Sequence, residues 1–251
     1  MIILLLSTMN LSAIKPDRVY PYTPDKLGLT YEELKVRTKD GLSLNVWHLP
    51  SETGGIPVII SQSDAGNMGS WLYLGLYLQA YGLDVWMYDY RGFGQSDDFR
   101  IVSDQLFHTE FVTDLDAVAE HVYARTGKSP VMMGISMGTV IVNEFLRETD
   151  IPVNKVIFDG YVAEPDEWIR KLAENGKTVV LPEGYRNRRY RPRHTDCLYI
   201  VSEKDEYSTI HDIPKTGRNR QVIKEFDCEH ISGFFRYPDE YTEAVTAFIE
   251  Q

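Results

Sequence analysis

The chain has 251 residues, of which 43% are hydrophobic, 25% charged and 12% aromatic, and its 26 Lys and Arg against 37 Asp and Glu give a net charge of −11. This composition is typical of a soluble globular protein and excludes a disordered, collagen-like or coiled-coil chain. An acidic surface repels phosphate backbones, so we expect no nucleic-acid partner. Two cysteines make neither a disulfide framework nor a Cys-rich zinc site, and they leave the compartment open.

Residues 1–28 are predicted to form an extended lead-in segment, since residues 15–24 hold three prolines. The apolar run at residues 2–6 is too short to span a bilayer, and no Lys or Arg precedes Lys15, as a basic signal-peptide start would require. Two interpretations stay open. A buried strand corresponds to a cytoplasmic protein, which we favour slightly, and a truncated signal or anchor corresponds to an exported or membrane-tethered one.

From residue 31 onward, strand-like and helix-like segments alternate. Eight short apolar or alternating segments predict strands at 33–38, 42–49, 57–61, 84–90, 131–135, 155–158, 197–202 and 221–226. Helical patterns predict helices at 70–80, 110–126, 137–148, 165–174 and 238–250. Because such alternation builds βαβ units, residues 29–251 are predicted to be one α/β domain. We expect a mostly parallel eight-stranded sheet flanked by helices, with ligands beyond the carboxyl ends of its strands.

The sharpest motif is Gly134-Ile135-Ser136-Met137-Gly138, which follows an apolar strand pattern and precedes a helical one. A G-x-S-x-G sequence in this context is typical of the strained strand-to-helix turn that exposes a nucleophilic serine. The glycines are required because the backbone folds back too tightly there for a Cβ atom. Ser136 is therefore the predicted nucleophile.

A serine hydroxyl needs a general base, and that base needs an orienting acid. Asp205 follows the strand at 197–202 and His230 follows the strand at 221–226, so both are expected at the carboxyl edge of the sheet. We predict that His230 is the base and Asp205 the acid. Four other carboxylates are alternatives to Asp205: Glu203, Glu206, Asp227 and Glu229.

From about residue 29 to its end, the chain resembles the α/β-hydrolase superfamily. The resemblance rests on the paired N-terminal strands, on residues 89–96 (D-Y-R-G-F-G-Q-S), which are similar to a D-x-R-G-x-G-x-S stretch, on the serine motif, and on the order of the acid and histidine loops. Within residues 89–96, we expect Arg91 to hold a buried ion pair and to be structural.

The chain is most similar to serine-aminopeptidase-like hydrolases and to membrane-tethered hydrolases that remove fatty acyl groups from proteins. The resemblance implies a serine hydrolase that cleaves carboxylic ester or thioester bonds of a small-molecule acyl substrate through an acyl-enzyme, without a metal or organic cofactor. A membrane surface stays possible as a second partner. The oligomeric state is left open. The alternative is an inactive ligand-binding protein on the same fold.

The loop after the strand at 57–61 departs from the family pattern. The family usually has His-Gly before the residue that donates to the oxyanion, whereas this chain has Gln62-Ser63 followed by Asp64. A side chain does not remove the backbone N–H, so Asp64 and Met137 are the expected oxyanion donors. An ionised carboxylate near a developing oxyanion nevertheless opposes it.

A small lid is expected at about residues 160–196, where larger members carry a cap domain. Its arginine-rich stretch, which includes Arg188 and Arg189, is either a solvated loop or a basic rim for an anionic acyl substrate or lipid surface. Tyr161 and Trp168 follow the strand at 155–158, and each either lines the substrate pocket or packs in the core.

Overall fold

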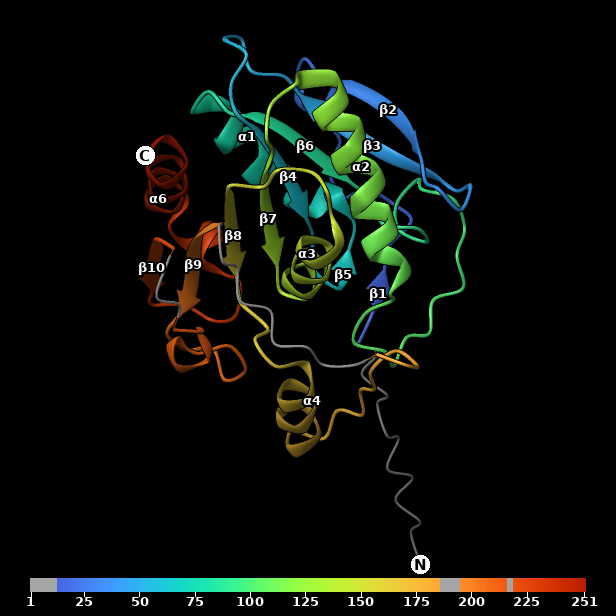
Figure 1. Ribbon diagram of the computed structural model, residues 1–251, viewed down its shortest axis with the longest axis vertical. Coiled ribbons are helices and arrows are strands. Elements are labelled where there is room, and N and C mark those ends of the chain that lie inside the picture. The colour runs from blue at the N-terminus through green and yellow to red at the C-terminus, as the bar shows by residue number, and fades with distance from the viewer. Residues whose placement is uncertain (1–12, 186–194, 216–218) are drawn as a thin grey trace, which may run out of the picture.

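A mostly parallel eight-stranded sheet forms the centre of the computed structural model, which describes residues 13–185, 195–215 and 219–251 (Figure 1). The strands are β2 Glu32–Arg37, β3 Ser43–Leu49, β4 Pro57–Ser61, β6 Asp84–Tyr88, β7 Val131–Ile135, β8 Lys155–Asp159, β9 Asp196–Ser202 and β10 Gln221–Phe226. Their order is β10-β9-β8-β7-β4-β6-β3-β2. Only the β2–β3 and β3–β6 pairs of this sheet are antiparallel. The predicted fold class is confirmed.

Helices cover both faces of the sheet (Figure 1). They are α1 Leu72–Ala80, α2 Glu110–Thr126, α3 Met137–Glu148, α4 Pro165–Glu174, α5 Gly233–Arg236 and α6 Pro238–Glu250. α2 and α3 pack on one face, and α1 and α6 on the other. The prediction for α1 began two residues early, because a 3-10 turn at Met68–Trp71 precedes that helix. Within the described ranges, no helix has the length and apolar character that crossing a membrane requires.

The central strands are buried on both faces, which explains their unbroken apolar runs. Successive side chains of a strand point to opposite faces. Ile59 of β4 therefore packs with α2 and α3, whereas its neighbours Val58 and Ile60 pack with α1 and α6. Two hydrophobic layers hold the sheet rigid, and its carboxyl edge can present side chains in fixed positions.

The predicted ion pair of Arg91 is present and buried. The side chain is 2% exposed, its Nε donates to Asp114 at 2.9 Å, and its Nη1 donates to Asp40 at 2.6 Å. The hydrogen bond from Arg91 holds the pKa of Asp40 at about 2. These contacts fix residues 89–96 against α2, so Arg91 stabilises the fold, as expected.

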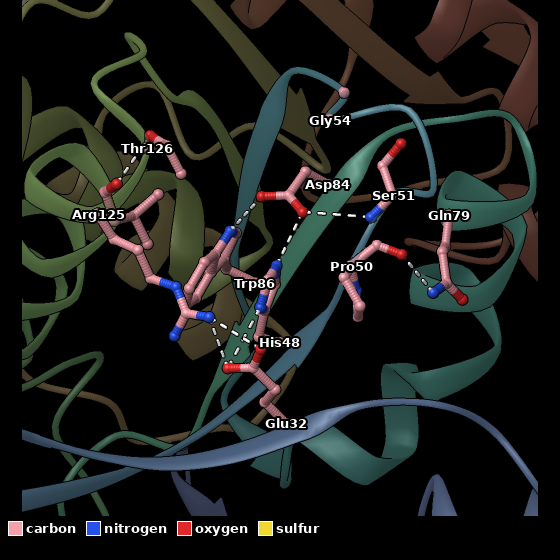
Figure 2. A network of polar contacts seen from close by, with 12 residues as sticks. Glu32, His48, Pro50, Ser51, Gly54, Gln79, Asp84, Trp86, Arg125 and Thr126 are labelled. Atoms are coloured by element: carbon pink, nitrogen blue, oxygen red, sulfur yellow. Dashed lines mark hydrogen bonds and ion pairs between the residues drawn. The ribbon is translucent and has the colours of Figure 1, made fainter.

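A second polar network ties β2, β3, β6 and α2 together at the opposite end of β6 from its carboxyl edge (Figure 2). Asp84 Oδ1 lies 2.8 Å from His48 Nε2, and Asp84 Oδ2 accepts the indole N–H of Trp86 at 2.8 Å. The His48 ring stacks on Trp86 at 3.8 Å, and Arg125 pairs with Glu32 at 2.7 Å. This histidine–aspartate pair is packed among strands and therefore has a structural role.

Candidate active site

The turn between β7 and α3 holds Ser136 in a strained conformation, with φ 50° and ψ −115°. Its backbone N–H donates to Asp159 O at 2.8 Å. A Cβ atom on Gly134 would lie 2.7 Å from the Gly138 carbonyl oxygen, and one on Gly138 would lie 2.0 Å from the Ser61 carbonyl oxygen. Both motif glycines are thus required by close backbone contacts, as the sequence motif indicates.

Ser136, His230 and Asp205 form one chain of hydrogen bonds across three loops at the carboxyl edge of the sheet. Ser136 Oγ lies 2.9 Å from His230 Nε2, and His230 Nδ1 lies 2.5 Å from Asp205 Oδ2. The other oxygen of Asp205 accepts the backbone N–H groups of Tyr207 at 2.8 Å and Ser208 at 3.1 Å. The aspartate is therefore held as an acceptor, and it faces the imidazole.

The alternative carboxylates have other surroundings. Asp227 pairs with Lys204 at 2.5 Å, and Glu229 pairs with Arg236 at 2.6 Å. Glu203 and Glu206 are exposed to solvent. In the described part of the chain, Asp205 alone of the five candidates is hydrogen-bonded to His230.

Two further backbone features fix the histidine loop, and the sequence motifs did not point to them. A Cβ atom on Gly160 would lie 2.6 Å from His230 Cε1, so this glycine lets the end of β8 approach the imidazole. Ile231, which follows the histidine, has φ 49°. Among the described residues, Ile231 and Ser136 are the two non-glycine residues with positive φ, and such strain gathers at functional sites.

Both expected oxyanion donors lie beside the serine. Met137 and Asp64 line the same cavity as Ser136. Their role stays a prediction. Burial raises the pKa of the Asp64 carboxyl, although a hydrogen bond from its own backbone N–H, His230 and two lysines oppose this shift.

A cavity of about 140 Å³ opens at Ser136 and His230. Apolar and aromatic side chains form most of its remaining wall, with one cation and one carboxylate: Ala13, Leu106, Trp168, Leu172, Val179, Tyr207, Lys177 and Asp64. Trp168 also lies 5.8 Å from His230, measured between ring centres. Of the two pocket candidates on this side of the sheet, Trp168 therefore lines the cavity.

Tyr161 does not line this cavity and belongs to the core. It is buried, packs 4.8 Å from Phe158 between ring centres, and accepts a hydrogen bond from Asn143 at 3.3 Å. Arg188 and Arg189 lie outside the described residues.

The wall residues Lys177 and Tyr207 were not singled out in the sequence. Tyr207 lies two residues after Asp205 and could have been expected from that spacing, whereas Lys177 follows α4 within no motif.

A family model described as serine aminopeptidase, S33, matches residues 62–206, which span the elbow and the Asp205 loop. The chain belongs to this family of α/β hydrolases. It is 36% identical to an uncharacterised membrane protein of Saccharomyces cerevisiae over 76 residues, 30% of this chain and 27% of the relative. It is 30% identical to the alpha/beta hydrolase domain-containing protein WAV2 of Arabidopsis thaliana over 128 residues, 49% of this chain and 40% of the relative. The matches thus span less than half the length of both relatives.

The fold is similar to that of a solved esterase, Pf2001 of Pyrococcus furiosus. The TM-score is 0.73 at 17% identity, over 94% of this chain and 98% of the esterase. At this identity the likeness shows the fold alone. The family match and the structural likeness agree on the α/β-hydrolase fold.

Proposed function

We propose that the protein is a serine hydrolase that cleaves small carboxylic esters or thioesters through an acyl-enzyme. The observation that carries this proposal is the chain of hydrogen bonds from Ser136 through His230 to Asp205, at a strained turn that opens into a cavity. Such an arrangement activates a serine hydroxyl at neutral pH. Membership of the serine aminopeptidase family supports the reaction class.

The contacts define the role of each group. With its Nδ1–H directed at Asp205, His230 presents a lone pair on Nε2 to the serine hydroxyl. As Ser136 Oγ attacks the acyl carbonyl, its proton passes to Nε2, and Asp205 stabilises the resulting imidazolium. The C–O or C–S bond then breaks, and Nε2 returns the proton to the leaving alcohol or thiol.

Water completes the cycle. It attacks the acyl carbonyl and gives a proton to His230, which returns it to Ser136 Oγ as the acid product leaves. In both steps the backbone N–H groups of Met137 and Asp64 would hold the oxyanion.

The cavity wall supports an acyl substrate. Leu106, Leu172 and Val179 provide an apolar surface for the acyl chain, and Trp168 and Leu172 come from α4. We propose that residues 160–196 are a small lid, of which α4, Lys177 and Val179 contribute to the cavity wall. Lys177 adds a cation to the wall, which favours acyl groups with a carboxylate.

One observation favours the alternative of an inactive ligand-binding protein. The Asp64 carboxylate lines the cavity at the residue whose N–H should stabilise the oxyanion. The two functions differ in turnover.

Hydrolysis of p-nitrophenyl esters and acyl thioesters of increasing chain length, with Ser136→Ala as the control, separates them. We expect the wild-type protein to turn over at least one series and the variant to lose at least about 10³-fold in kcat. Equal rates in both proteins, or no turnover by the folded wild-type protein, would favour the alternative.

A further inference from the structure

The loop that carries the proposed oxyanion donor is hydrogen-bonded to a segment far upstream in the sequence. We call residues 64–67 the oxyanion loop and residues 13–19 the strap. The two-residue strands β1 Lys15–Pro16 and β5 Ala65–Gly66 pair in parallel (Figure 1). The Lys15 N–H donates to Asp64 O at 2.8 Å, and the Asp17 N–H donates to Gly66 O at 2.8 Å. The strap thus holds the peptide units on both sides of β5.

The side chain of Asn67 makes a second connection between the same two segments. It is fully buried, and its Nδ2 donates to the carbonyl oxygens of Asp17 at 3.0 Å and Val19 at 2.8 Å. Its Oδ1 accepts the Gly69 N–H at 3.1 Å. A single amide therefore uses both ends to join the oxyanion loop, the strap and the following 3-10 turn.

The strap is itself anchored to the central sheet. The hydroxyl of Tyr20, the residue after the strap, is hydrogen-bonded to Asp89 Oδ2, and Asp89 Oδ1 accepts the Met68 N–H at 2.9 Å. The Gly94 N–H donates to Asp17 O at 2.9 Å. At its upstream end, Ala13 lines the catalytic cavity. The strap therefore transmits the fixed position of the sheet to the loop beside Ser136.

We propose that the strap sets the position of the Asp64 N–H, and that Asn67 is a positioning residue for the oxyanion. The proposal rests on the proposed function, because it explains the pairing of β1 with β5 by the need to place an oxyanion donor in that reaction. An oxyanion donor acts only when it lies within about 2.7–3.1 Å of the developing charge. Two main-chain hydrogen bonds and the two donated by Asn67 would hold the loop to that tolerance.

Asn67→Ala tests the proposal, because it removes both side-chain bonds to the strap. We expect kcat for a turned-over ester to fall at least about 10-fold with KM within about twofold, because a displaced donor weakens the transition state and leaves the ground state unchanged. The rate constant for phosphonylation of Ser136 by a fluorophosphonate should fall in parallel.

Thr195→Val is the control. Thr195 is also buried, and its Oγ1 donates to the Val153 carbonyl oxygen at 2.9 Å just before β9. Neither residue belongs to the strap or the oxyanion loop, so this variant should lose stability in urea unfolding yet keep kcat within about threefold of wild type.

Lys15→Pro is a second variant in case Asn67→Ala does not fold. It removes the N–H that donates to Asp64 O at an exposed residue, and Glu52→Pro is its control because Glu52 is exposed in the turn at residues 51–54, outside the strap and the oxyanion loop. We expect Lys15→Pro to lose kcat and Glu52→Pro to keep it.

A folded Asn67→Ala or Lys15→Pro protein with wild-type kcat would overturn the positioning role and leave the proposed function intact. A wild-type protein that neither turns over ester nor reacts with the fluorophosphonate would overturn both. The two failures are distinguishable, since the second is read from the wild-type protein alone.

Discussion

Replacing Asp64 with Asn removes a charge from the oxyanion loop and keeps the backbone N–H. Asp64 lines the cavity with Ser136, and burial raises the pKa of its carboxyl. When ionised, this carboxylate repels the negative charge that develops on the substrate oxygen. Asn has nearly the same shape, so Asp64→Asn isolates the electrostatic effect.

The size of the effect follows from covalent geometry and Coulomb's law. The carboxylate belongs to the residue whose own N–H is the proposed donor, so the two negative charges lie within about 7 Å of each other. At this distance the repulsion is about 2.4 kcal/mol at an effective dielectric constant of about 20, and about 0.6 kcal/mol at about 80. Asp64→Asn should therefore raise kcat between about 3-fold and about 60-fold where Asp64 is ionised.

The assay is the pH dependence of kcat for one ester in both proteins. Below the raised pKa of Asp64 the wild-type carboxyl is neutral and the repulsion is absent, so the ratio of variant to wild-type kcat should approach one. As pH rises through that pKa the ratio should increase to its plateau. A variant with lower kcat at every pH would refute the reasoning and would show that the carboxylate has a positive role, such as binding a cationic group. A ratio that does not change with pH would also contradict it.

Four further predictions follow from the contacts described. Asp205→Asn should lower kcat by about 10⁴-fold, because an amide neither stabilises the imidazolium nor keeps the required tautomer; a loss below about 10-fold in ester hydrolysis would contradict the assigned role. Asp114→Asn leaves Arg91 buried with one charged partner fewer, so the free energy of unfolding in urea should fall by about 3–5 kcal/mol. A decrease of less than about 1 kcal/mol would count against a stabilising pair. Arg91 holds the pKa of Asp40 at about 2, below its ordinary 3.8, so the ionised Asp40 stabilises the fold above about pH 4 and this stabilisation is lost as pH falls toward 2. In Asp40→Asn the free energy of unfolding should therefore change less with pH between about 4 and 2 than in the wild-type protein. An equal pH dependence in both proteins would oppose the assignment. Lys177→Met should raise KM at least about 10-fold for esters with a terminal carboxylate and leave neutral esters of equal length within about twofold; equal shifts would exclude a charge effect.

The buried strands and long helices of this fold could be predicted because their signals are local. An apolar run such as Pro57–Ser61 fits a strand buried on both faces, and α2 repeats its apolar residues at helical spacing before a terminal glycine. The grouping of Ser136, His230 and Asp205 could be predicted because the topology brings the carboxyl ends of three strands to one edge.

Features that depend on tertiary contacts left no such signal. The strap pairs through the two-residue strands β1 and β5, which are too short to show any periodicity. Tyr161 and Trp168 follow the same strand end, and the sequence does not distinguish which of them lines the pocket. Only their packing in the fold does. Lys177 approaches the cavity because of where α4 ends. The helix α5 is four residues long, which is too short to show a helical periodicity.

The central claim is that Ser136 is an activated nucleophile. Intact mass after exposure to a fluorophosphonate, for the wild-type protein and for Ser136→Ala, tests it most directly. We expect one adduct on the wild-type protein and none on the variant. No adduct on a wild-type protein shown to be folded, or an adduct that persists in Ser136→Ala, would contradict the claim.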